Sequence, residues 1–108
     1  MGILDSVFGS FTARGKALAL YRRGMQKAED RNLEGAIEDY SAVVAMKGVP
    51  PDVVAMALFN RALAYSRTRD DEKAKVDLDL VLEMAEAPAK VKDAASEKLR
   101  RMKRRPEA

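Results

Sequence analysis

The stretch ALFNRALAYSRTRDDEKAKVDL, residues 57–78, decides the fold of this chain. Its apolar residues recur at steps of three and four on either side of a polar run, TRDD at 68–71, and this is the periodicity of amphipathic helices. A break of only a few residues favours an antiparallel arrangement of the two helices. The stretch therefore predicts a helical hairpin, with Asp70 or Asp71 as the N-cap of its second helix.

The same pattern occurs once more, earlier in the chain. Residues 17–44, ALALYRRGMQKAEDRNLEGAIEDYSAVV, align without a gap on residues 55–82 at an offset of 38. Asn32 is the matching candidate N-cap. Small residues that we expect at the crossing of each helix pair are twelve positions apart in both copies: Gly24 and Ala36, then Ala62 and Ala74. The chain is thus predicted to contain two copies of one hairpin.

The repeated unit resembles the tetratricopeptide repeat (TPR), whose pattern runs W-x2-L-G-x2-Y, then A-x3-F, then P. The first copy reads Leu20-x2-Arg23-Gly24-x2-Lys27, then Ala36-x3-Tyr40; the second reads Leu58-x2-Arg61-Ala62-x2-Tyr65, then Ala74-x3-Leu78, with Pro88 near the expected end. The resemblance covers about residues 17–88. Arg23 and Arg61 depart from the pattern by replacing its leucine, and Lys27 replaces an aromatic residue. The repeat is also longer than about 34 residues, with the extra residues at KGVPPD, where Pro-Pro ends one helix and Asp52 can start the next.

The expected fold is all-α: a superhelix of two antiparallel helix pairs, a capping helix and a short N-terminal amphipathic segment. We expect one domain made of an N-terminal segment (1–16), two repeats (17–50 and 51–88) and a basic capping helix with its tail (89–108). The apolar stripe that predicts the capping helix consists of Val91, Ala95, Leu99 and Met102.

The N-terminal stretch MGILDSVFGSF allows several interpretations. Its apolar residues fall at helical spacing: Ile3, Leu4, Val7, Phe8 and Phe11. Docking onto the first repeat, or into the groove of this or a neighbouring molecule, is the preferred interpretation. Shallow membrane contact with help from Arg14 and Lys16, and N-myristoylation through Gly2 and Ser6, are the alternatives.

The composition excludes several classes of chemistry. The chain has no Cys and no His, which excludes disulfides, thiolate nucleophiles, Cys/His zinc sites and an imidazole base. Its acidic residues, Asp77 and Asp79 among them, are expected on solvated faces or at helix breaks. We therefore predict no enzyme activity, no cofactor, and no catalytic or metal site. The lack of an apolar run long enough for a membrane span, together with the lack of a signal-peptide pattern, favours a cytoplasmic location.

The resemblance to the TPR family implies a concave surface, lined by the first helix of each pair, that holds a partner peptide or helix. The residues that this alignment carries onto the surface are Leu18, Tyr21, Arg22, Met25 and Ala28 from the first copy and Met56, Phe59, Asn60, Leu63 and Arg67 from the second. Asn60 also matches one position of the carboxylate clamp found in some family members. Tyr21 and Met25 occupy two other clamp positions, so a complete clamp is not expected.

Protein–protein interaction through this surface is the function that the sequence favours, with an unidentified protein or peptide as partner. A self-associating structural unit is the main alternative. Binding of an anionic surface is a second one, because residues 1–31 hold six Lys/Arg against three acids and residues 89–108 hold eight against three. Nucleic acid and membrane are the disfavoured partners.

Overall fold

The structure, a computed structural model, describes residues 3–104, with side chains described from residue 13 onward. These residues form α-helices only, with no strand among them. The five helices are α1 (Ile3–Glu29), α2 (Leu33–Ala45), α3 (Pro51–Arg67), α4 (Asp71–Glu83) and α5 (Ala89–Arg104). The predicted all-α fold is confirmed.

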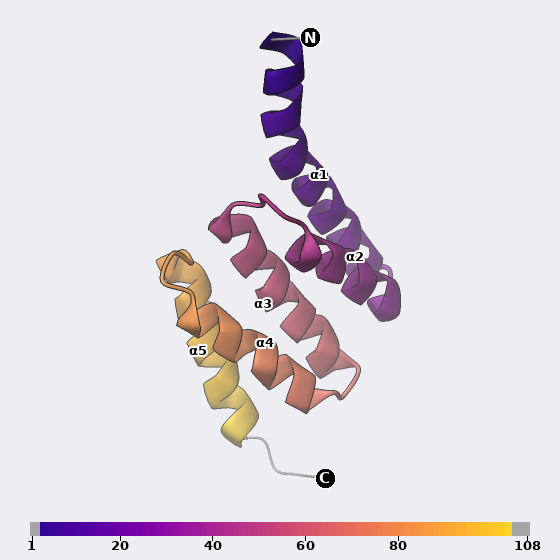
Figure 1. Cartoon of the computed structure of the whole chain (residues 1–108). Helices are drawn as coiled ribbons and strands as arrows, with labels where there is room; N and C mark the ends of the chain where they lie inside the picture. The colour runs from indigo at the N-terminus through magenta and orange to yellow at the C-terminus, as the bar shows by residue number, and fades with distance from the viewer. Residues whose placement is uncertain (1–2, 105–108) are drawn as a thin grey trace.

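The helices form two hairpins and a cap (Figure 1). α1 packs against α2, α3 packs against α4, and α5 covers α4. α1 also contacts α3, and α3 contacts α5, whereas α2 and α4 do not meet within the described chain. α2 therefore packs on both α1 and α3, and α4 packs on both α3 and α5, while α3 contacts both α1 and α5.

The 38-residue offset recurs in the helix boundaries. α4 begins 38 residues after α2, and α5 begins 38 residues after α3. By the same offset α1 would begin at residue 13, yet it begins ten residues earlier at Ile3. The N-terminal turns of α1 thus extend beyond the repeated unit, and Figure 1 shows them projecting past the rest of the bundle.

The helix predicted for the N-terminal segment continues without a break into the first helix of the first hairpin. The predicted docking of the apolar side chains at positions 3–11 concerns residues whose side chains lie outside the described part of the structure. The candidate lipid attachment at Gly2 and the last residues of the basic tail also lie outside the described part.

Both hairpin turns use the predicted capping side chains. The Asn32 carboxamide oxygen accepts a hydrogen bond from the Gly35 backbone N–H at 3.0 Å, and the Asp70 carboxylate accepts one from the Lys73 backbone N–H at 3.3 Å. Asn32 is confirmed as an N-cap, and Asp70 rather than Asp71 holds that role in the second hairpin.

The residue before each cap lies in the left-handed region, with φ of 66° at Arg31 and 67° at Arg69. The next backbone N–H in each turn donates a hydrogen bond to the carbonyl five residues earlier. The Asn32 N–H donates to the Lys27 carbonyl and the Asp70 N–H donates to the Tyr65 carbonyl, both at 2.8 Å. These six-to-one bonds satisfy carbonyls that the end of each first helix would otherwise leave unpaired.

The longer connection between α2 and α3 contains the Pro-Pro pair. Pro50 occupies the N-cap position of α3, without a capping side chain, and Pro51 is the first helical residue. The expectation that Asp52 is the N-cap of α3 is therefore wrong, because the N-cap lies two residues earlier, at Pro50. Asp52 lies in the first turn, where its carboxylate is 3.4 Å from the Arg14 guanidinium of α1.

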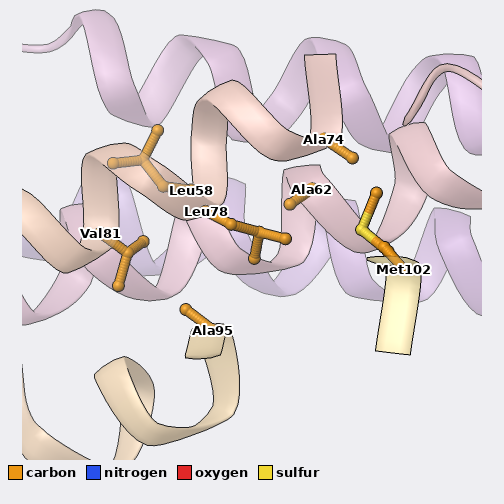
Figure 2. Close-up of a cluster of buried hydrophobic side chains, with 7 residues drawn as sticks. All are labelled: Leu58, Ala62, Ala74, Leu78, Val81, Ala95 and Met102. Atoms are coloured by element: carbon orange, nitrogen blue, oxygen red, sulfur yellow. The ribbon is translucent and has the colours of Figure 1, made fainter. Parts of the chain in front are cut away.

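Two apolar clusters form the core of the described chain: the first joins α1 and α2 to the first half of α3, and the second joins the rest of α3 to α4 and α5. The first contains Ala17, Ala36, Tyr40, Val43, Val53 and Ala57. The second, drawn in Figure 2, contains Leu58, Ala62, Ala74, Leu78, Val81, Ala95 and Met102. Ala95 and Met102 come from α5, and Val91 and Leu99 pack beside them. α5 thus covers the apolar side of the second hairpin, as its stripe predicts.

The two helix crossings differ in one respect from expectation. A side-chain carbon at Gly24 would lie 2.7 Å from the Tyr40 ring. Glycine is therefore required at position 24 by contact with Tyr40, and not by contact with Ala36 as expected. In the second hairpin the same two positions hold Ala62 and Leu78, both fully buried. The ring opposite glycine and the smaller leucine opposite alanine fill the same space.

Candidate protein-binding surface

The predicted binding residues all lie on α1 and α3, the adjacent first helices of the two hairpins. Two hydrogen bonds link these helices directly. The Asn60 amide nitrogen donates to the Tyr21 hydroxyl at 2.9 Å, and an Arg67 guanidinium nitrogen donates to the Ala28 carbonyl at 3.4 Å. The structure therefore brings the two predicted sets of residues side by side. We call this surface of α1 and α3 the groove face.

Asn60 has a structural role on the groove face. Its amide nitrogen donates a second hydrogen bond, at 2.9 Å, to the backbone carbonyl of Met56 one turn earlier. An amide group has two N–H donors, so both are used within the chain. Only the Asn60 carbonyl oxygen is left to meet a partner, as an acceptor. Asn60 thus lacks the free donor that binding of a carboxylate would require.

Tyr21 connects the groove face to the core beneath it. Its ring lies 5.9 Å from the Tyr40 ring, centroid to centroid, in a tilted arrangement. Burial raises the pKa of the Tyr21 hydroxyl, and the hydrogen bond from Asn60 opposes that effect. The hydroxyl is therefore neutral at physiological pH and acts as a hydrogen-bond partner for Asn60.

The predicted residues divide into an exposed set and a supporting set. Met25 is 40% exposed, and Arg22 and Arg67 are exposed beside it on α1 and α3. The remaining apolar members are half-buried, and five of them pack against the core clusters: Leu18, Tyr21, Ala28, Met56 and Phe59. Leu63 is also half-buried. The groove face thus presents an exposed methionine and two cations above a half-buried apolar layer.

Sequence reasoning missed two ion pairs that join the first and second helices of the hairpins. Arg61 donates two hydrogen bonds to the Asp77 carboxylate at 2.8 and 2.7 Å. Arg23 donates two to Asp39 at 2.9 and 2.8 Å. Asp77 is almost fully buried, so the prediction that it is solvated is wrong. The available signal was that both pairs are 16 residues apart and recur at the 38-residue offset.

The charges in these pairs are satisfied within the chain. Hydrogen bonds from Arg23 lower the pKa of the Asp39 carboxyl although its burial opposes this, and the Lys27 ammonium lies 3.1 Å from the same carboxylate. Hydrogen bonding to Asp77 raises the pKa of the Arg61 guanidinium. The two ion pairs join the helices of each hairpin by charge-assisted hydrogen bonds.

Among residues 3–104, no helix has both the length and the apolar character that crossing a membrane requires. Comparisons with protein-family models, with curated proteins and with solved structures found no match to this chain.

Proposed function

We propose that the chain is a non-catalytic, TPR-like protein-interaction module that binds a peptide or an amphipathic helix on the groove face. The observation that carries this proposal is the exposure of Met25 on α1, a helix linked to α3 by the Tyr21–Asn60 hydrogen bond, together with the exposure of Arg22 and Arg67. An unbranched, polarizable methionine adapts to different apolar side chains of a partner. The cytoplasmic location expected from the sequence stays a prediction.

The support for a binding role comes from how rigidly this face is held. The Tyr21–Asn60 hydrogen bond and the Tyr21–Tyr40 ring contact join α1, α3 and α2 at one point. A surface that is already ordered loses little conformational entropy when a partner binds. The groove face can therefore contribute most of its contact energy to affinity.

The chemistry of the face describes the partner in general terms. An apolar side chain of the partner would contact Met25 and Leu63. Arg22 and Arg67 can pair with acidic groups of the partner by charge-assisted hydrogen bonds. The Asn60 carbonyl oxygen can accept a hydrogen bond from a partner N–H group.

Affinity capture from the source cell tests the proposal with Met25→Glu as the binding variant. Phe59→Ala is less suitable, because Phe59 packs against the second core cluster and its loss would also affect stability. Glu38→Lys is the matched control, since Glu38 is exposed on α2 and is not a groove-face residue.

Loss of the captured partner with Met25→Glu, and its retention with Glu38→Lys, is the expected result. Thermal unfolding of both variants must match that of the original chain. Equal capture by Met25→Glu and the original chain would contradict the groove face as the binding surface.

A further inference from the structure

A second surface of α1 is hollowed and uncovered. Lys16, Ala19, Leu20 and Arg23 of α1, with Met46 at the end of α2, line an open depression of about 550 Å³. The floor is apolar, with Lys16 and Arg23 as its cationic members. We call this depression the α1 flank, and it includes none of the predicted groove residues.

The second copy of the repeat has a surface that matches the α1 flank and is covered by another helix. The residues that match the α1 flank 38 positions later are Val54, Ala57, Leu58 and Arg61 of α3. Ala57 and Leu58 are buried, and α2 packs against α3. An Arg61 guanidinium nitrogen donates to the Ser41 hydroxyl of α2 at 3.0 Å. A second helix of a hairpin therefore covers this surface in the second copy.

The exposure of the two matching arginines shows that one surface is covered and the other is not. The Arg61 side chain is 16% exposed, whereas the Arg23 side chain is 61% exposed. Both donate the same two hydrogen bonds to their aspartates. Arg61 makes its third hydrogen bond to the covering helix, and no covering helix lies over Arg23 within the described chain. The α1 flank thus has the residues of a helix-packing surface without the helix.

One exposed face of the described chain complements the α1 flank. Val76 and Leu80 lie one turn apart on α4 and are 58% and 41% exposed. The other exposed residues of this helix are three acids and two lysines: Glu72, Asp79, Glu83, Lys73 and Lys75. An apolar pair bordered mainly by acids matches an apolar floor bordered by cations. We call this surface the α4 face.

We infer that the α4 face of a second copy of this chain packs on the α1 flank. This pairing rests on the apolar and charge complementarity of the two surfaces, since Val76 and Leu80 match Glu38 and Ala42 of α2 at the 38-residue offset, whereas α2 contacts Arg61 of α3 through Ser41. α5 is a poor occupant, because its exposed Lys and Arg side chains would meet Lys16 and Arg23. Since the two surfaces differ, the contact is heterologous and forms either a closed ring or an open chain of copies.

Sedimentation velocity of the full chain, from micromolar to millimolar concentration, tests the inference. The average mass of the original chain should rise above the 11.9 kDa of one copy as concentration increases. Leu80→Lys should raise the dissociation constant at least about tenfold, because it puts a charge into the apolar contact. Met25→Lys is the matched control: Met25 is similarly exposed but lies on the groove face, so association should be unchanged.

A charge exchange identifies the two surfaces as partners. Lys16→Glu and Asp79→Lys should each weaken association, because each replaces an attraction by a repulsion. The double variant should restore it. A single-copy mass at every concentration, equal weakening by Met25→Lys and Leu80→Lys, or no recovery in the double variant would each overturn the inference. Lys16, Asp79 and Leu80 are not groove-face residues, so their variants leave that face unchanged and the proposed function is tested separately.

Discussion

Arg61 on α3 and Asp77 on α4 form a two-point ion pair whose hydrogen bonds measure 2.8 and 2.7 Å, with both side chains largely buried. A planar guanidinium that meets a carboxylate at two points fixes the relative position of the groups that carry them. Arg23 and Asp39 repeat the arrangement in the first hairpin. The two hairpins thus share one arginine–aspartate pairing between their helices.

The ion pair of the second hairpin should be strongly coupled in stability. Arg61→Leu leaves the Asp77 carboxylate buried without its partner, and we expect a loss of about 3–5 kcal/mol. The double variant Arg61→Leu/Asp77→Leu should recover most of that loss, because both charges are gone. Urea unfolding of the single and double variants measures the coupling. A double variant as unstable as the single one would contradict this account.

The first hairpin supplies the comparison for that experiment. Arg23 is more exposed than Arg61, and Lys27 also lies beside the Asp39 carboxylate. Arg23→Leu should therefore cost clearly less stability than Arg61→Leu, since water and Lys27 still compensate the aspartate. Equal losses in the two hairpins would show that burial does not set the strength of these pairs.

The contact between Gly24 and Tyr40 predicts a specific rescue. Gly24→Ala places a carbon 2.7 Å from the Tyr40 ring, and we expect a loss of about 1–3 kcal/mol from overpacking. Adding Tyr40→Leu reproduces the Ala62 and Leu78 pair of the second hairpin. The loss in free energy of unfolding of the double variant should then be smaller than the sum of the losses of the two single variants. Simple additivity in urea unfolding would contradict the proposed packing.

The left-handed residues of the hairpin turns offer a route to higher stability. Arg31 and Arg69 have positive φ values, a conformation that costs a residue with a side chain about 1–2 kcal/mol. Arg31→Gly and Arg69→Gly should each raise the midpoint of thermal unfolding. Gly48→Ala is the opposite control, because Gly48 has a φ of 77° and should lose stability. Lower midpoints for both glycine variants would contradict the turn geometry.

Stability should fall in alkaline solution through Tyr40. Burial raises the pKa of the Tyr40 hydroxyl to about 12, above the ordinary tyrosine value of 10.0. The folded state thus holds this proton more tightly than the unfolded state, so the contribution is complete below pH 10 and is lost between pH 10 and about 12. Tyr40→Phe should flatten the decline in the free energy of unfolding over that interval. An unchanged pH profile would contradict the burial of this hydroxyl.

The sequence predicts the hairpins because their signals are local. Apolar spacing identifies the helices, and Asn32 and Asp70 cap the helix that follows within three residues. The packing of α5 on the second hairpin can also be predicted from the sequence, because the apolar residues that make the contact recur at helical spacing within one helix.

What the sequence does not reveal depends on residues that meet across helices. The burial of Asp77 follows from its contact with Arg61, 16 residues away on another helix. The donors of Asn60 are used because Tyr21, 39 residues earlier, lies beside it. Neither contact leaves a periodic pattern within one helix, so local reading assigns Asp77 to a solvated face and leaves Asn60 open for a ligand.

The most direct test of the proposed function is position-specific photo-crosslinking in the source cell. A photoreactive amino acid is placed at position 25 on the groove face, and at position 38 on the outer side of α2 as the control. The account predicts a discrete crosslinked partner from position 25 and none from position 38. The same partner from both positions, or crosslinks from position 38 alone, would contradict binding at the groove face.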